Sequence, residues 1–129
     1  TVGRVLTFRN VHNWAKAGKA EAVFASFFKA LKPGGILGVV EHRAPEGRSL
    51  DAQIESGYMT ESYVIAQAEK AGFRLAEQSE MNANPRDSAD HPAGVWTLPP
   101  SLRLGDKDRE KYLAIGESDR MTLKFVKPE

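Results

Sequence analysis

Two short apolar segments with a helix-like segment between them constrain the fold of this chain most. Val5–Phe8 and Ile36–Val40 are continuous, β-prone runs, which is typical of buried strands. From 20 to 31 the apolar residues follow the spacing of an amphipathic helix, and Pro33-Gly34-Gly35 ends it. This order predicts a right-handed βαβ unit, with Ile36–Val40 as a strand buried on both faces of a parallel sheet.

Loops and one capped helix are expected around this unit. Turn-forming residues predict loops over 11–18 and 44–57. Thr60 precedes a helix-like stretch and Gly72 follows it. Because a threonine hydroxyl accepts a hydrogen bond from a free N–H group and glycine adopts left-handed geometry easily, these two residues predict the ends of a helix.

The C-terminal part adds two strands separated by a long insertion. Residues 73–77 alternate in polarity as a half-exposed strand does, and so do residues 121–126. Between them, 81–118 is expected to be an insertion, with little periodicity at first and a short helix over 106–115 closed by a glycine. The whole order fits one α/β domain of 129 residues.

Composition narrows the classes of partner. The formal net charge is +1 and the basic residues are scattered, so we predict no nucleic-acid partner. No segment approaches the roughly 18 uninterrupted apolar residues of a membrane span, so we predict no membrane partner. The chain contains no cysteine, which excludes disulfides, thiolate catalysis and cysteine metal sites.

Three motifs resemble class I S-adenosylmethionine-dependent methyltransferases. The segment Leu31–Leu37, with the sequence LKPGGIL, is similar to the one that leads into the fifth strand of that family. Val5–Val11 resembles the fourth strand and its loop, and Glu69–Phe73 resembles the entry to the sixth strand. The resemblance implies the C-terminal half of a Rossmann-like α/β sheet: strands four to seven with an insertion before the seventh, and strands one to three absent. Residues 1–129 would then be a partial domain.

A narrower resemblance covers nearly the whole chain. The stretches 8–14, 90–92, 94–100 and 115–121 resemble a bacterial group of predicted methyltransferases whose substrate is unassigned. Members of that group often carry a secretion signal. The resemblance is therefore compatible with an extracytoplasmic location, while the cytoplasm is the default expectation.

The resemblance implies S-adenosylmethionine as cofactor and methyl transfer to a small-molecule nucleophile by the complete protein. Family members hold the cofactor with a glycine-rich turn after the first strand and an acidic residue after the second. Neither is present here, since Gly34-Gly35 precedes a strand. We therefore expect this chain alone to be inactive. The alternative is a non-catalytic half-domain, a binding module whose exposed strand-four edge pairs with a second copy to give a homodimer.

Candidate site residues follow the ends of the two apolar strands, where open parallel sheets bind ligands. Arg9, Asn10 and Val11 are candidate cofactor contacts, and His12 beside them is a candidate base. The alternative is that Asn10 only fixes the turn while Arg9 pairs with a surface acid. His42 is the first candidate for general base because imidazole titrates near neutral pH. A structural role, bonded to a loop carbonyl, is the alternative for His42.

Candidate substrate contacts lie after the second strand and in the insertion, which could close over a pocket as a lid. They are Glu41, His91, Trp96, Glu117 and Asp119. Trp96 either lines an apolar slot or anchors the loop to the core. Glu117 and Asp119 either point into the pocket or form a solvated turn with one ion pair.

The three histidines raise the question of a metal site. His12, His42 and His91 could converge on one rim, and imidazole suits zinc or iron. No close ligand pair of the HxxxH type is present. We therefore predict no metal site.

Overall fold

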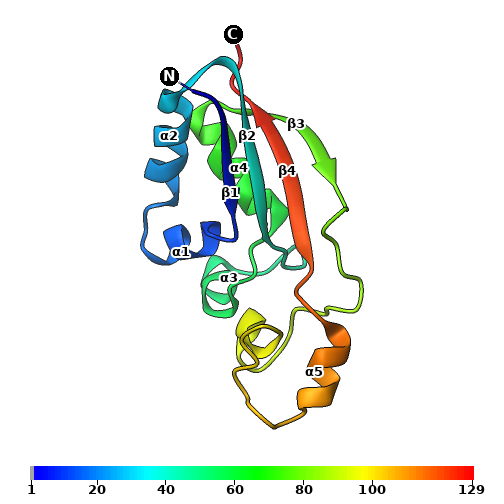
Figure 1. Cartoon of the computed structure of the whole chain (residues 1–129). Coiled ribbons are helices and arrows are strands. Elements are labelled where there is room, and N and C mark those ends of the chain that lie inside the picture. Colours follow the sequence, from blue (N-terminus) through cyan, green and yellow to red (C-terminus); the bar gives the residue numbers. More distant parts are fainter. Residues whose placement is uncertain (1) are drawn as a thin grey trace.

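The parallel strand pair predicted from the sequence is present in the computed structural model, which describes residues 2–129. β1 (Val2–Phe8) runs parallel to β2 (Leu31–His42). The helix α2 (Ala20–Ala30) connects them, and Figure 1 shows the three elements side by side. The predicted βαβ unit is therefore confirmed.

The sheet is completed by two strands that enter it in reverse order. β4 (Arg120–Val126) lies antiparallel between β2 and β3 (Arg74–Ser79). The resulting order is β1-β2-β4-β3, a four-stranded mixed sheet. The last strand of the chain thus lies in the interior of the sheet, with Leu37 of β2 opposite Phe125.

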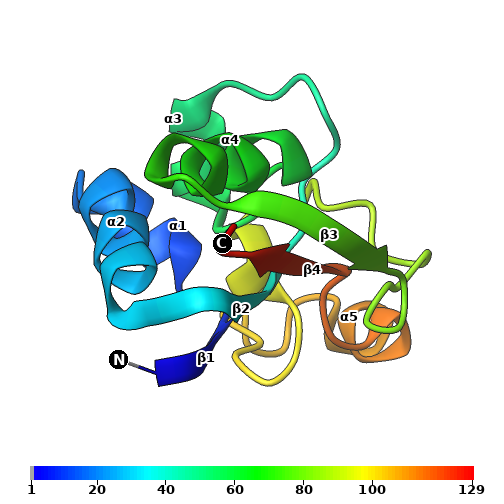
Figure 2. The same ribbon diagram turned by 90° about the horizontal axis from the view of Figure 1, so that it is seen from above.

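Helices α2 and α4 (Glu61–Ala71) pack side by side on one face of this sheet (Figure 2). Their apolar residues meet those of β2 and β4 because the helical spacing places them on one side of each helix. Thr60 and Gly72 bound α4 as predicted: the Thr60 hydroxyl accepts from the backbone N–H of Tyr63, and Gly72 has a φ of 112°. The fully buried core on this face includes Phe24, Leu37, Val39, Val64, Ala68, Leu123 and Phe125.

Both predicted loops contain a short helix, so these two predictions were wrong. α1 (Val11–Lys16) follows β1 almost directly, and α3 (Leu50–Ser56) lies in the segment after β2. The Ser49 hydroxyl accepts a hydrogen bond from Ala52 at the start of α3. Helices of 6 and 7 residues are too short to show a repeating apolar pattern, which explains the error.

The prediction that β2 is buried on both faces was also wrong. Its residues Leu37 and Val39 are fully buried beneath the helices, whereas Ile36 and Val40 on the opposite face are only half-buried. No helix within residues 2–129 covers that second face. Leu6 and Phe8 of the neighbouring strand belong to it and are 64% and 56% exposed.

The predicted insertion lies below the carboxyl ends of β1 and β2 (Figure 1). It contains a 3-10 turn at Gly94–Thr97 and the helix α5 (Arg109–Ile115), which Gly116 closes as expected. Val95 packs with Ala44 and Tyr58 in a small second core. No helix in the described part of the chain is long and apolar enough to cross a membrane.

Candidate functional site

A buried histidine–glutamate pair lies where β1 and β2 end. β1 is followed by α1, which places His12 in the first turn of that helix, and Glu41 points from β2 toward it. Nδ1 of His12 lies 3.0 Å and 3.1 Å from the two carboxylate oxygens of Glu41. The backbone N–H groups of His12 and His42 also donate to this carboxylate, each with a nitrogen–oxygen distance of 2.9 Å. Glu41 is 0% exposed and His12 is 8% exposed.

These contacts fix the chemistry of the His12 ring. A carboxylate that accepts from Nδ1 holds the proton on that nitrogen and leaves the lone pair on Nε2. This tautomer is assigned from the hydrogen bonds. Glu41 was a candidate substrate contact, but its carboxylate is buried and bonded to three N–H groups. Its carboxylate is therefore not accessible for direct contact with a ligand.

His42, the first candidate for general base, lies in a different environment. Its ring centroid is 5.5 Å from that of His12, and its Nδ1 is hydrogen-bonded to the Ser118 hydroxyl. Burial, and after it the nearby His12, Arg120 and Arg9, lower the pKa of His42 from 6.5 to about 3. An imidazole with that pKa is neutral at physiological pH and takes up a proton poorly. The geometry therefore favours His12 over His42 as a base.

A cavity of about 160 Å³ lies against His42 and the insertion. Its apolar wall includes Trp96, whose ring centroid lies 6.0 Å from that of His12 in an edge-on arrangement. Trp96 also packs on the second core and lies under the guanidinium of Arg103, so it both lines the cavity and anchors the loop. The cavity is lined by Arg9, His42, Val95, Trp96, Pro99, Pro100, Ser101, Ser118 and Arg120.

The three candidate cofactor contacts occupy different places. Arg9 lines the cavity, with a left-handed φ of 56°. Asn10 is exposed and precedes α1, where its carbonyl side chain accepts weakly from Asn13. Val11 is fully buried in the main core, so none of its atoms is accessible to a ligand.

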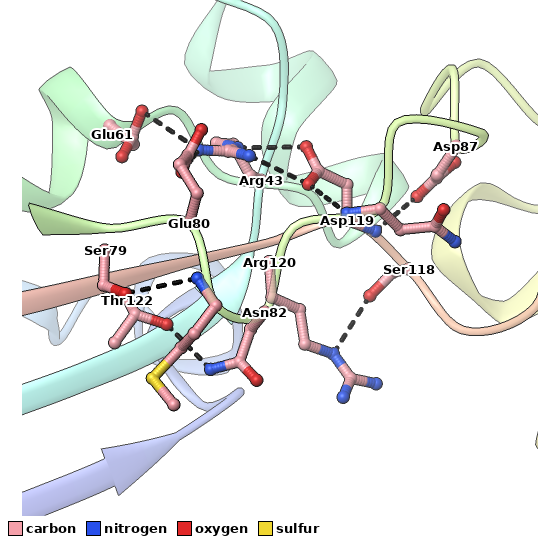
Figure 3. A network of polar contacts seen from close by, with 12 residues as sticks. Arg43, Glu61, Ser79, Glu80, Asn82, Asp87, Ser118, Asp119, Arg120 and Thr122 are labelled. Carbon is pink, nitrogen blue, oxygen red and sulfur yellow. Dashed lines mark hydrogen bonds and ion pairs between the residues drawn. The ribbon is translucent and has the colours of Figure 1, made fainter.

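His91, Glu117 and Asp119, the remaining candidates, belong to a polar network, and Figure 3 shows its part around Asp119. Asp119 holds Arg43 through two hydrogen bonds of 2.9 Å and 3.0 Å, and its backbone N–H donates to Asp87. The second oxygen of Asp87 lies 2.8 Å from Nε2 of His91. Glu117 pairs with Arg120. Asp119 and His91 are thus bound to other side chains and tie the insertion to the end of β2.

Several residues of this network were not predicted from the sequence. Arg43 also pairs with Glu80. The hydroxyl of Tyr58 donates to Asp87, and burial, followed by this hydrogen bond, raises the pKa of that hydroxyl. The hydrogen-bond partners of Arg43 lie 37 and 76 residues away in the sequence, and a further ion-pair partner is Glu61. No local motif marks contacts of that kind, so only the fold reveals them.

Two of the three histidines converge, and they do so around Glu41. One ligand atom each of His12, Glu41 and His42 lies within 4.8 Å of the others, a donor set suited to a transition metal. His91 is bound to Asp87 instead. Both carboxylate oxygens of Glu41 already accept N–H groups, so the cluster is satisfied by hydrogen bonds alone. The absence of a metal site stays a prediction.

Comparisons with known proteins relate this architecture to solved structures. The chain superposes on the [4+2]-cyclase SpnF with a TM-score of 0.63 at 17% identity, covering 99% of this chain and 50% of the cyclase. A chain from the complex of the Haloferax volcanii Trm112 methyltransferase activator with a proposed methyltransferase gives 0.59 at 15% identity, covering 100% and 55%. A proposed S-adenosylmethionine-dependent methyltransferase from Listeria monocytogenes gives 0.54 at 16% identity, covering 99% and 62%.

These likenesses establish the fold alone. No protein-family model matches the chain, and no curated protein matches it. The chain spans about half the length of the solved structures that it resembles. Its structural neighbours include S-adenosylmethionine-dependent methyltransferases, so it has an α/β fold that corresponds to roughly half of such an enzyme.

Proposed function

We propose that this chain is the C-terminal half of a class I methyltransferase, and that the complete protein transfers a methyl group to a small-molecule nucleophile. The observation that carries the proposal is the buried His12–Glu41 pair at the carboxyl ends of two parallel strands. Ligands of open α/β sheets bind at that edge. The strand order β1-β2-β4-β3 supports the choice of half, since β1 resembles the fourth strand of the family and β4 the seventh.

The residues of this chain would orient and deprotonate the acceptor. His12 would take the proton of an acceptor hydroxyl or amine on Nε2. The methyl group would come from the sulfonium of S-adenosylmethionine, whose bond to the methyl carbon would break with release of S-adenosylhomocysteine. Glu41 would hold the imidazole in the required orientation and stabilise the positive charge that develops on it. The insertion, with Trp96 facing His12, would exclude water from this edge.

S-adenosylmethionine is the proposed cofactor and would supply the activated methyl group. The described residues do not by themselves form a site that could hold it. Directly after β1 stands Arg9, and directly after β2 stands Arg43; neither strand end in residues 2–129 carries a glycine-rich turn. Arg9 and Asn10 could touch the cofactor only from one side. We therefore propose that the chain alone is inactive and that the other half binds the cofactor.

The base role of His12 can be tested in the complete protein. We expect His12→Gln to lower the rate of radiolabelled methyl transfer by about 10²- to 10⁴-fold, the usual contribution of a general base. His91→Gln is the matched control, since His91 is also buried beside a carboxylate but outside the cluster. Near-normal turnover by His12→Gln, with the fold checked by circular dichroism, would contradict the proposal.

A second candidate function is supported by the open face of the sheet. Leu6 and Phe8 are largely exposed, and with Ile36 and Val40 they line an apolar groove of about 360 Å³. Apolar patches and unpaired strand edges of this kind mark interaction surfaces. In this reading the chain is a non-catalytic binding or dimerisation module.

Calorimetry separates the two candidates. A half-enzyme should bind S-adenosylmethionine only when its other half is present. Titration with S-adenosylmethionine should therefore give a heat of binding with the complete protein and none with residues 1–129. If the complete protein also fails to bind the cofactor, the methyltransferase proposal is wrong and the module remains. Tight binding by residues 1–129 alone would contradict the proposed division of labour between the halves.

A further inference from the structure

The cavity beside His42 carries positive charge. Of its nine lining residues, Arg9 and Arg120 are cationic, and no acidic side chain lines it in the described part of the chain. The pKa of His42 is consistent with this positive charge. Burial and His12 are the main causes of its low value, and the charges of Arg120 and Arg9 lower it further. Both guanidinium groups therefore act on the same small volume.

Arg9 provides the uncompensated charge. Its side chain is exposed and forms no ion pair or hydrogen bond with any of residues 2–129. Its backbone is fixed, because its N–H donates to the carbonyl of Val40 at 2.6 Å and its φ is 56°. Left-handed geometry is unfavourable for a residue with a side chain, and such geometry is concentrated at functional sites. The fold thus holds a free guanidinium at the rim of the cavity.

Arg120 provides a second, oriented donor. Its Nε donates to the Ser118 hydroxyl at 3.2 Å and its Nη2 pairs with Glu117 at 2.9 Å (Figure 3 shows the bond to Ser118). Its Nη1 donates to none of the residues that the structure describes. Two of its three nitrogens are therefore used to hold the guanidinium in place, and the third remains for a ligand.

The walls of the cavity indicate what kind of anionic ligand would fit. Val95, Trp96, Pro99 and Pro100 are apolar or aromatic, and the volume of about 160 Å³ admits only a compact group. A planar guanidinium matches a planar carboxylate in geometry as well as in charge. A flat apolar body would pack against the indole of Trp96 while its carboxylate meets the two arginines.

We infer that the acceptor is a small organic acid whose carboxylate binds between Arg9 and Arg120, with its apolar body against Trp96. That the bound acid is the methyl acceptor rests on the proposed function, whereas the carboxylate site itself does not. His12 does not itself line the cavity, but its ring centroid lies 6.0 Å from that of Trp96, the wall against which the apolar body would pack. The S-adenosylmethionine carboxylate is a second source of the same chemistry, and the test separates the two.

The test is a titration of residues 1–129 with benzoate and with its neutral isostere benzamide, followed by two-dimensional amide NMR. We expect benzoate to shift the Arg9 and Arg120 signals and to bind at least tenfold more tightly than benzamide. Arg9→Gln and Arg120→Gln should each weaken benzoate at least tenfold. Arg74→Gln is the control, since Arg74 is exposed on β3 away from the cavity. Equal binding of benzoate and benzamide, or an unaffected Arg9→Gln variant, would overturn the inference.

Two further ligands identify the source of the carboxylate. S-adenosylhomocysteine keeps the amino-acid carboxylate of the cofactor, and methylthioadenosine lacks it. If only S-adenosylhomocysteine binds, through Arg9, and benzoate does not, the site belongs to the cofactor and the acceptor inference is wrong. Because binding is measured without methyl transfer, this test does not depend on whether the complete protein is active. An inactive complete protein that retains Arg9-dependent benzoate binding would refute the proposed function and leave the carboxylate site standing.

Discussion

At the scale of single residues, the hydrogen bonds of the buried Glu41 carboxylate have two consequences. A buried carboxylate is destabilising unless its oxygens are hydrogen-bonded. Here two backbone N–H groups and the His12 ring meet that requirement. The same bonds fix the orientation of His12, so the contacts that make burial of the carboxylate tolerable also set the tautomer that the proposed base requires.

His42 gives the free energy of unfolding a pH dependence that a His42→Gln variant would lack. Because burial lowers its pKa from 6.5 to about 3, the unfolded chain binds a proton between these pH values that the folded chain does not. Stability from His42 is therefore complete above the unfolded pKa and is lost as the pH falls toward the folded one. The slope is at most about 1.4 kcal/mol per pH unit.

Urea denaturation of wild type and His42→Gln between about pH 4 and about pH 8 measures this effect. We expect the difference in unfolding free energy between the two proteins to be constant above about pH 7 and to change steadily below about pH 6. Carboxylates titrate in both proteins and cancel in the difference. Parallel curves over the whole range would show that His42 is not protected from protonation in the folded chain.

The sequence located the candidate site but not its bonding. His12, Glu41 and His42 were candidates because they follow apolar strands, and the fold does bring all three together. That Glu41 is buried against His12 depends on a pairing across 29 residues. No local pattern contains such a pairing. Asp119 was expected either to point into a pocket or to stand in a solvated turn with one ion pair. It does form an ion pair, but its partner, Arg43, lies 76 residues away and could not be named from the sequence.

At the scale of elements, the end of α3 determines how closely the insertion approaches the domain. Gly57 closes α3 with a φ of 79°, and a side chain there would meet Val95 at 2.8 Å and Trp96 at 2.9 Å. The 3-10 turn that carries Val95 and Trp96 can pack against α3 only because this position is glycine. The helix terminus thus positions the aromatic wall of the cavity.

A matched pair of glycine substitutions isolates that contact. Gly47 also has a left-handed φ, of 94°, but nothing lies within 4 Å of the position that its side chain would take. We expect Gly47→Ala to cost about 1 kcal/mol of stability from backbone strain. Gly57→Ala should cost about 1–3 kcal/mol more through overpacking, and it should shift the tryptophan emission of the folded protein. Equal losses in denaturation experiments would mean that the insertion moves away without cost.

The long helices and the strands could be predicted from the sequence, whereas the shortest helices could not. The 11-residue helices α2 and α4 show a clear apolar spacing, and all four strands were found. The short helices α1 and α3 were taken for loops because neither has enough turns to repeat a pattern. The second face of β2 is apolar in the sequence, but no helix among residues 2–129 covers it, and a local pattern could not show that.

At the scale of the whole molecule, the open face of the sheet predicts association. Phe8 is 56% exposed in the isolated chain, so Phe8→Glu should change the stability of a monomer by only about 0.5 kcal/mol. In an assembly that covers this face, the same charge would be buried without a partner. We therefore expect residues 1–129 to dimerise in light-scattering measurements and Phe8→Glu to be monomeric.

Met81→Glu is the control for this prediction. Met81 is 78% exposed and does not line the apolar groove, so the variant should dimerise like the wild type. A wild-type chain that stays monomeric at every concentration would contradict the prediction. So would a Phe8→Glu variant that still forms dimers.

The reversed entry of β4 into the sheet sets the order in which the molecule can be built. β3 pairs with β4 and with no other strand of the sheet, and β4 comes last in the chain. As the polypeptide leaves the ribosome, β1 and β2 can join as soon as residue 42 has emerged, but β3 must wait for residues 120–126. Until then β3 and the free side of β2 both present unpaired backbone. The nascent chain is therefore most open to wrong pairing during synthesis of the insertion, and arrival of the final strand closes both gaps in one step.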